Sequence, residues 1–164
     1  MKKIKVLFVC LGNICRSPLA EAIFKEKIKK AGLAQFIEAD SCGTSNYHLG
    51  DPPDPRTIAN ALQNGVTIDH CGRQLQTEDL ENFDYIFVMD NQNLENVMRL
   101  PNAHSHRNKI ALMRSFDPVM RNENVPDPYF GDEKGFQYVF DVLDRTLDHF
   151  ITHLKTTELR AKVS

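Results

Sequence analysis

Residues 4–18 read IKVLFVCLGNICRSP and combine a strand, a loop and the start of a helix. The apolar run Ile4–Val9 is nearly continuous, which is typical of a strand that is buried on both faces. Ser17 and Pro18 then predict a helix start, with the serine as N-cap and the proline as the first helical residue.

The alternation of strand and helix continues along the chain. This first helix is expected to end at Gly32, and a second strand is predicted over Phe36–Ser41. The apolar patterns further predict helices over Arg56–Gln63, Asn91–Leu100 and Phe136–Leu154 and strands over Tyr85–Met89 and Lys109–Leu112. Such alternation predicts an α/β fold, in which a parallel sheet is flanked by helices on both faces. Ligands of these sheets bind beyond the carboxyl ends of the strands.

Length and composition predict one ordinary globular domain. The chain has 164 residues, and its 20 lysines and arginines against 22 acidic residues give a net charge of −2. No basic field is therefore available for nucleic acid or an anionic membrane, and no apolar run reaches the roughly 18–20 residues of a membrane span. We place the domain at residues 1–155 and expect the tail, residues 156–164, to fray because the helical pattern is lost there.

The cysteines and the N-terminus point to the cytoplasm. The apolar stretch Val6–Val9 is too short for a signal peptide and does not lead into a cleavage site. The four cysteines, Cys10, Cys15, Cys42 and Cys71, are few for a disulfide scaffold and form no Cys-x2-Cys pair. We expect free thiols and no metal site.

The loop after the first strand has the residues of an anion site. Backbone N–H groups converge between a strand and a helix N-terminus, and Gly12 and Asn13 are residue types that tolerate positive φ. Arg16 adds a planar fork that matches phosphate oxygens. These groups would stabilise a thiolate at Cys10, which would then face phosphorus as a nucleophile, with the Ser17 hydroxyl close to its sulfur. The alternative for Cys10 is a small apolar residue that closes a strand.

A phosphate ester also needs a proton donor for its leaving group. Asp127 is the candidate, because Pro126 and Pro128 fix its backbone and aromatic neighbours can exclude water. The alternative is a turn aspartate, since Asp before Pro commonly starts a turn. Asp54, Asp117 and Asp132 lie in nearby loops and are the substitutes for the acid.

Two motifs resemble one enzyme family. Residues 9–21, VCLGNICRSPLAE, resemble the signature loop of the low-molecular-weight protein tyrosine phosphatases, and Asp127-Pro128-Tyr129 resembles their general-acid loop. The resemblance covers nearly the whole chain. It implies a single domain with a four-stranded parallel sheet in a flavodoxin-like three-layer sandwich, without metal or cofactor. The implied activity is hydrolysis of phosphotyrosine and small aryl phosphates through a phosphocysteine.

The resemblance also implies roles for individual residues. Cys10 would be the nucleophile, Arg16 would hold the equatorial phosphoryl oxygens, and Asp127 would protonate the leaving oxygen and later deprotonate water. The backbone amides that would hold the phosphate belong to Leu11, Gly12, Asn13, Ile14, Cys15 and Arg16. The side chains that would support the loop are Asn13, Ser17, Ser41 and His70. The side chains that would wall the substrate cleft are Tyr47, His48, Tyr129 and Phe130.

Three positions refine this expectation. Ile14 replaces the threonine that is usual in relatives acting on phosphoarginine, and so favours phosphotyrosine. Cys15 either forms a reversible disulfide with Cys10 under peroxide, as in some family members, or simply packs. His48 stands where the family varies and tunes substrate preference. We expect phosphotyrosine-containing proteins as substrates, inhibition by inorganic phosphate or other oxyanions, and a monomer.

Two other functions compete with this one. Thiol-dependent arsenate reductases share the fold and loop but need further cysteines in a mobile segment, and no cysteine follows Cys71. A phosphoanion-binding module without catalysis would lack either the thiol or the acid, and both Cys10 and Asp127 are present. The sequence therefore favours the phosphatase.

Overall fold

The computed structural model describes residues 2–163 and contains one four-stranded sheet. All strand pairs are parallel, and the strands lie in the order β2-β1-β3-β4. Their bounds are β1 Ile4–Cys10, β2 Ile37–Gly43, β3 Tyr85–Val88 and β4 Ile110–Leu112. The predicted fold class is confirmed, and each predicted strand is present with ends that differ by one or two residues.

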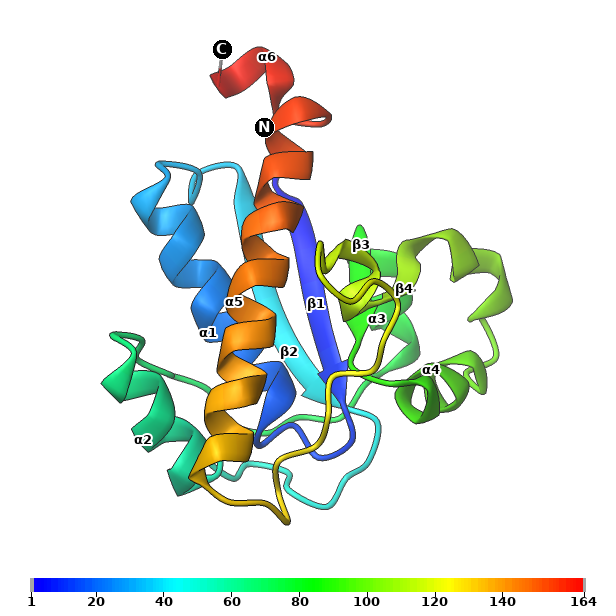
Figure 1. Cartoon of the computed structure of the whole chain (residues 1–164). Helices are drawn as coiled ribbons and strands as arrows, with labels where there is room; N and C mark the ends of the chain where they lie inside the picture. The colour runs from blue at the N-terminus through cyan, green and yellow to red at the C-terminus, as the bar shows by residue number, and fades with distance from the viewer. Residues whose placement is uncertain (1, 164) are drawn as a thin grey trace.

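Helices cover both faces of the sheet, as predicted. Figure 1 shows α1, α2 and α5 on one face and α3 and α4 on the other. The long helices are α1 Arg16–Lys30, α2 Pro55–Gln63, α4 Asn91–Met98 and α5 Glu133–Thr156, and the short ones are α3 Thr77–Asn82, α6 Arg160–Val163 and the 3₁₀ turns η1 His104–Lys109 and η2 Met113–Phe116. Within residues 2–163 no helix has the length and apolar content to cross a membrane.

The central strand β1 separates two apolar cores. Its residues Val6 to Val9 are fully buried, as a strand covered on both faces requires. Phe8 points into the core under α1 and α5, where its ring lies 5.7 Å from that of Phe24. Leu7 and Val9 point into the other core, under α3 and α4. This alternation fixes β1, and with it the loop that follows, at the centre of the molecule.

The loop after β1 lies at a topological switch point. From β1 the chain runs through α1 to β2 on one side, and later reaches β3 on the other side of β1. The register aligns Cys10 with Gly43 of β2, and Val9 with Val88 of β3. Three strands therefore end at one edge, around Cys10, where open α/β sheets bind their ligands.

The start of α1 corrects one prediction. The helix begins at Arg16 with Cys15 as its N-cap, so Ser17 is the second helical residue and Pro18 the third. The Ser17 hydroxyl does not cap the helix because it is directed at Cys10, 3.0 Å from Sγ. Pro18 is tolerated there because N–H groups in the first turn have no partner within the helix.

Two further segments differ from the expectations. Helix α3 was not predicted because its six residues are too few to show a period, although a capping box between Gln76 and Asp79 marks its start. The tail was expected to fray after Lys155, yet Leu159 is buried in the core and α6 follows it. Leu159 N also donates to Leu154 O over 2.9 Å, so an apolar contact outside the helical pattern orders this segment. The domain boundary itself stays a prediction.

Candidate active site

Residues 10–16 run from the end of β1 to the start of α1 and are called the phosphate loop below. Asn13 has a φ of 57°, whereas Gly12 keeps a negative φ, so only one of the two expected positions is left-handed. A side chain at Gly12 would instead meet the His48 ring, whose Cδ2 lies 3.0 Å from the position of an added Cβ. Gly43 passes even closer, since a Cβ there would lie 2.8 Å from Leu11 O. Both glycines therefore serve close packing around the loop.

Asn13 is held by four hydrogen bonds that use its whole amide. Its Nδ2 donates to Ser17 Oγ over 2.8 Å and to Ser41 Oγ over 3.0 Å. Its Oδ1 lies 2.7 Å from His70 Nε2 and accepts from Arg73 N over 3.1 Å. These bonds hold the left-handed residue, so the structure brings together all four side chains predicted to support the loop.

The Cys10 sulfur lies beside the Ser17 hydroxyl at the end of β1. Ser17 Oγ accepts from Asn13, which leaves its own hydrogen for an acceptor. The two nearest acceptors are Cys10 Sγ at 3.0 Å and Cys42 O at 3.4 Å. A thiolate is the stronger acceptor of the two, so this hydroxyl stabilises the ionised sulfur.

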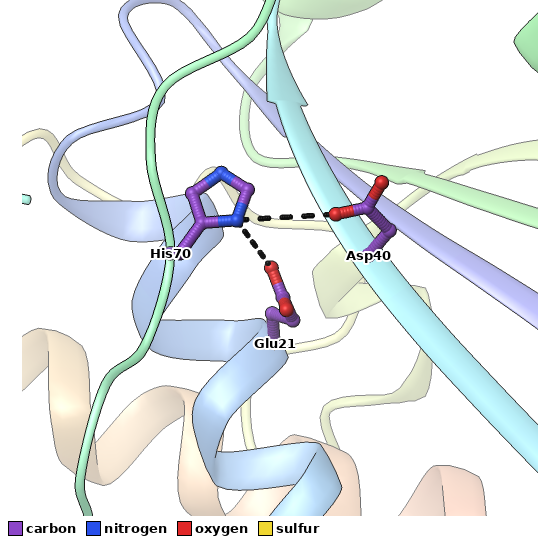
Figure 2. A group of neighbouring side chains, drawn as sticks. All are labelled: Glu21, Asp40 and His70. Atoms are coloured by element: carbon purple, nitrogen blue, oxygen red, sulfur yellow. Dashed lines mark ion pairs between the residues drawn. The ribbon is translucent and has the colours of Figure 1, made fainter. Parts of the chain in front are cut away.

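Behind the loop, the predicted support residue His70 lies in a charged cluster with Glu21 and Asp40, which sequence reasoning did not select as site residues (Figure 2). His70 Nδ1 lies 3.2 Å from Glu21 Oε1 and 3.9 Å from Asp40 Oδ1. Ser41 Oγ donates to the same Glu21 oxygen over 2.6 Å. Glu21 and Asp40, together with His70, offer three ligand atoms within 4.8 Å, the spacing a metal needs. Within this cluster Glu21 contacts Ser41 and His70 contacts Asn13, so the cluster supports the phosphate loop.

Arg16 is a buried cation between two carboxylates. Its Nη1 donates to Asp90 Oδ2 over 2.7 Å and to Val125 O over 3.0 Å, and its Nη2 lies 3.7 Å from Asp127 Oδ2. Burial by itself would lower the pKa of Arg16, but Cys10, Asp90 and Asp127 outweigh it and raise that pKa. Arg16 thus stays charged beside the sulfur.

A cleft of about 260 Å³ opens above Cys10 and Arg16. The residues that line it are Cys10, Leu11, Gly12, Ile14, Cys15, Arg16, Tyr47, His48, Asp127, Tyr129 and Phe130. Its rim is aromatic and open, since Tyr47 is 72% and Phe130 93% exposed. His48 Nδ1 lies 3.2 Å from Asp51 Oδ2 at the same rim. All four predicted cleft side chains are brought together here.

Of the four candidate acids, Asp127 lines this cleft. Asp54 caps α2 and pairs with Arg56, and Asp132 caps α5. Asp117 is buried between Arg114 and Arg145. Asp127 lies in the acid loop, residues 127–131, where its Oδ1 accepts from Tyr129 N over 3.1 Å.

Cys15 also borders the cleft. It is buried, and this burial raises the pKa of its thiol to about 12. The negative charge of Asp54 disfavours the thiolate further. Cys15 is therefore a thiol at neutral pH.

Sequence reasoning did not select Asp90, although a signal was available. Asp90 follows β3 by two residues, and β3 ends at the same edge as β1. An acidic residue at this edge of a parallel sheet is placed to meet a cation from the neighbouring loop, which here is Arg16. Arg56 offered no comparable signal, because its partner at Tyr129 is a backbone carbonyl, which the residue type does not reveal.

Comparison with known proteins gives one consistent result. A sequence model of the family described as low molecular weight phosphotyrosine protein phosphatase matches residues 5–161. The phosphatase of that name from Schizosaccharomyces pombe is 49% identical over 136 residues, which are 82% of this chain and 86% of its own. The human one is 39% identical over 147 residues, 89% of this chain and 92% of its own.

Solved structures agree with the sequence relatives. The protein tyrosine phosphatase from Entamoeba histolytica, solved with Hepes in its active site, is 40% identical with a TM-score of 0.90, and the match covers 96% of this chain and 100% of that one. The drosophila arginine phosphatase is 35% identical with a TM-score of 0.85, covering 94% and 99% of the two chains. The chain belongs to the low molecular weight phosphotyrosine protein phosphatase family.

Proposed function

We propose that this protein hydrolyses phosphotyrosine in proteins, and small aryl phosphates, through a phosphocysteine on Cys10. The observation that carries this is the meeting of a thiol, a buried cation and an acid in one cleft. Cys10, Arg16 and Asp127 line the same 260 Å³ space, although Asp127 comes from the far half of the chain. Phosphoryl transfer asks for this combination of positioning and charge stabilisation.

The first step transfers the phosphoryl group to sulfur. The N–H groups of the phosphate loop and the Arg16 guanidinium hold the phosphate oxygens, and the Cys10 thiolate attacks phosphorus in line with the leaving oxygen. The bond between phosphorus and that oxygen breaks, and Asp127 in its acid form gives the oxygen a proton. Tyrosine leaves as a neutral phenol, and the phosphoryl group stays bound to Cys10.

The second step releases phosphate. Asp127, now a carboxylate, takes a proton from water while the water oxygen attacks phosphorus. The bond between phosphorus and sulfur breaks, and the electron pair returns to Cys10 as thiolate. The Ser17 hydroxyl, 3.0 Å from the sulfur, lowers the cost of this negative charge. Asp127 ends as the acid and the cycle closes.

The cleft favours an aromatic phosphate ester. Ile14 and Tyr129 present apolar surface on the walls, and Phe130 and Tyr47 extend it at the rim. A phenyl ring can pack against these groups, whereas the guanidinium of phosphoarginine would meet the apolar side chain of Ile14, where a threonine would offer it an acceptor. Ile14 thus supports phosphotyrosine even though one similar structure is an arginine phosphatase.

We extend the proposal to the setting of the enzyme. All four cysteines are free thiols, which supports a cytoplasmic, reducing compartment. The net charge of −2 supports a protein substrate and no nucleic acid. Inorganic phosphate and vanadate should inhibit, because the loop binds any tetrahedral oxyanion. The monomeric state stays a prediction that light scattering tests.

The experiment that tests the function compares wild type with Cys10→Ser. The variant should lose hydrolysis of a phosphotyrosine peptide by more than about 10³-fold yet bind vanadate, because Arg16 and the loop amides remain. Rapid quenching of the wild type should trap phosphate on Cys10. Hydrolysis by Cys10→Ser within tenfold of wild type would overturn the assignment.

A second measurement tests the substrate. Wild type should have a higher kcat/KM for phosphotyrosine than for phosphoarginine, and Ile14→Thr should raise the relative rate on phosphoarginine. A wild type that prefers phosphoarginine would contradict phosphotyrosine as the substrate while leaving the phosphocysteine mechanism intact.

A further inference from the structure

We propose that Arg56, the second residue of α2, is a positioning residue that sets the acid loop over Cys10. The inference rests on the proposed role of Asp127 as the acid. Arg56 does not touch the phosphate site, and half of its side chain is exposed. Its guanidinium nevertheless joins the phosphate loop to the acid loop through the contacts described next.

One side of Arg56 is fixed to the phosphate loop through Asp54. Arg56 Nε and Nη2 donate to the two Asp54 carboxylate oxygens over 3.1 and 2.9 Å. Asp54 is buried, and its own N–H donates to Ile14 O over 2.8 Å. Arg56 lowers the pKa of the Asp54 carboxyl, as a tight pair of this kind should. The guanidinium therefore has a fixed position relative to Ile14.

The other side of Arg56 holds Tyr129. Arg56 Nη2 donates to Tyr129 O over 2.8 Å, and its guanidinium carbon lies 5.5 Å from the Tyr129 ring centre. It also lies 4.8 Å from the ring centre of Phe136, in the first turn of α5. The cation thus contacts aromatic rings at both ends of the exposed segment between Tyr129 and Phe136.

Little else holds the acid loop. Within residues 2–163, the hydrogen bond from Arg56 to Tyr129 O is the one that joins residues 127–131 to the rest of the chain, and the others stay local. Asp127 adds an ion pair to Arg16 at 3.7 Å, which a bound phosphate would replace. Tyr129 N donates to Asp127 Oδ1 over 3.1 Å, so a carbonyl fixed at Tyr129 also fixes the carboxyl two residues earlier.

The chemistry predicts a specific defect when Arg56 is changed. A displacement of about 1 Å of a catalytic group costs up to roughly 10²-fold in rate. The defect should appear only with a substrate whose leaving group needs a proton as its bond to phosphorus breaks. Arg56→Gln should therefore lower kcat/KM, which reports the steps up to departure of the leaving group, by roughly 10- to 100-fold for phenyl phosphate and by less than about threefold for p-nitrophenyl phosphate. Arg56→Lys should behave similarly, because an ammonium cannot pair with a carboxylate by two bonds and bind a carbonyl at once.

The test is a double-mutant cycle with Asp127→Asn, assayed on both substrates. Once Asp127 is Asn, adding Arg56→Gln should cost no further activity on phenyl phosphate, because there is no acid left to position. Inorganic phosphate should inhibit Arg56→Gln as well as wild type, which shows that the phosphate loop is intact and the protein folded. The matched control is Arg99→Gln at the C-cap of α4, where the guanidinium is hydrogen-bonded to Asn96 of that helix. This variant should change the rate on neither substrate.

Three outcomes would overturn the inference while the assignment of Asp127 as the acid stands. Equal slowing of both substrates by Arg56→Gln would show a general structural defect, and weaker phosphate inhibition would place its effect on the phosphate loop. Full additivity with Asp127→Asn would show that Arg56 acts independently of the acid. If Asp127→Asn itself slows both substrates equally, the assignment of the acid fails, and this inference fails with it. If Asp127→Asn slows phenyl phosphate selectively but Arg56→Gln slows both substrates equally, this inference fails alone.

Discussion

Arg16 Nη1 donates to Asp90 Oδ2 over 2.7 Å, although 74 residues separate the two along the chain. The pair forms because β1 and β3 are neighbours, so the loops that follow them share one edge of the sheet. Asp90 also caps α4 by accepting from Asn93 N over 2.7 Å. One carboxylate therefore fixes both a helix start and the direction of the guanidinium that is to hold phosphate.

Replacing Asp90 with Asn should weaken phosphate binding without unfolding the protein. Asparagine caps helices as well as aspartate does, but it removes the charge that holds Arg16. Charge assistance is worth about 1–2 kcal/mol, so kcat/KM should fall and the inhibition constant of phosphate should rise by roughly tenfold. Asp141→Asn on α5 is the control, and an unchanged phosphate affinity in Asp90→Asn would contradict the role of the pair.

Asp127→Asn should make the rate depend on the leaving group. Phenolate leaves poorly unless it is protonated, whereas p-nitrophenolate needs little help, and general acid catalysis is worth roughly 10²–10⁴-fold. We expect a large loss on phenyl phosphate and a small one on p-nitrophenyl phosphate, measured as kcat/KM, because kcat also contains the second step, in which Asp127 activates water for either substrate. Asp132→Asn, which alters a helix cap, should leave this ratio unchanged. Equal losses on both substrates in Asp127→Asn would assign the acid elsewhere.

A methyl group at Gly43 should displace the phosphate loop. An added Cβ would lie 2.8 Å from Leu11 O and 3.2 Å from Asn13 N, and these are backbone atoms that cannot rotate away. Gly43→Ala should lower kcat/KM by up to roughly 10²-fold, because the loop amides would shift from the phosphate. At Gly135 in α5 an added Cβ would lie 4.0 Å from Asp132 Oδ1, an ordinary contact, so Gly135→Ala should keep full activity while gaining up to about 1 kcal/mol of stability. Full activity in Gly43→Ala would show that the loop can move without loss.

Peroxide should inactivate the enzyme reversibly through a bond between Cys10 and Cys15. Because burial raises the pKa of Cys15 to about 12, its thiolate fraction grows about tenfold per pH unit below that value. Closure of the disulfide should therefore speed up by about that factor from pH 7 to pH 8, measured by mass spectrometry after a peroxide pulse. Cys15→Ala should be oxidised irreversibly, and Cys42→Ala should behave as wild type. A link from Cys10 to Cys42 would refute this.

Asp117 should stabilise the fold from neutral pH down to about pH 4. Burial alone would raise the pKa of this carboxyl, but bonds from Arg145, Val119 N and Arg114 lower it below the usual range. A lowered folded-state pKa adds stability above the unfolded value of about 3.9, and this stability is lost as the pH falls further. Asp117→Asn should cost about 3–5 kcal/mol in urea unfolding at pH 7. The difference in unfolding free energy between Asp117→Asn and wild type should narrow at pH 3. A difference that stays constant with pH would contradict this role of Asp117.

Local patterns in the sequence were enough to predict most of the fold. The run Ile4–Val9 is apolar because both faces of β1 are buried, and this reads directly from the residues. The phosphate loop could be predicted for the same reason, because Cys10, Asn13 and Arg16 all lie within the short stretch of residues 10–16. The error at the helix start was also local: Ser17 has the residue type of a cap, but its hydroxyl is directed at Cys10.

The tertiary structure decided the contacts between distant segments. The sequence by itself determined most of the elements, though not α3, because hydrophobic period and turn residues act over a few neighbours. It named Asp127 as the acid with three other aspartates as substitutes, and it left open the strand order and the partners of Arg16 and Arg56. Parallel strands are joined by long crossovers that bring their carboxyl ends to one edge whatever the separation along the chain. Asp90 thereby meets Arg16 and Arg56 meets Tyr129, pairings that no local stretch of the sequence contains.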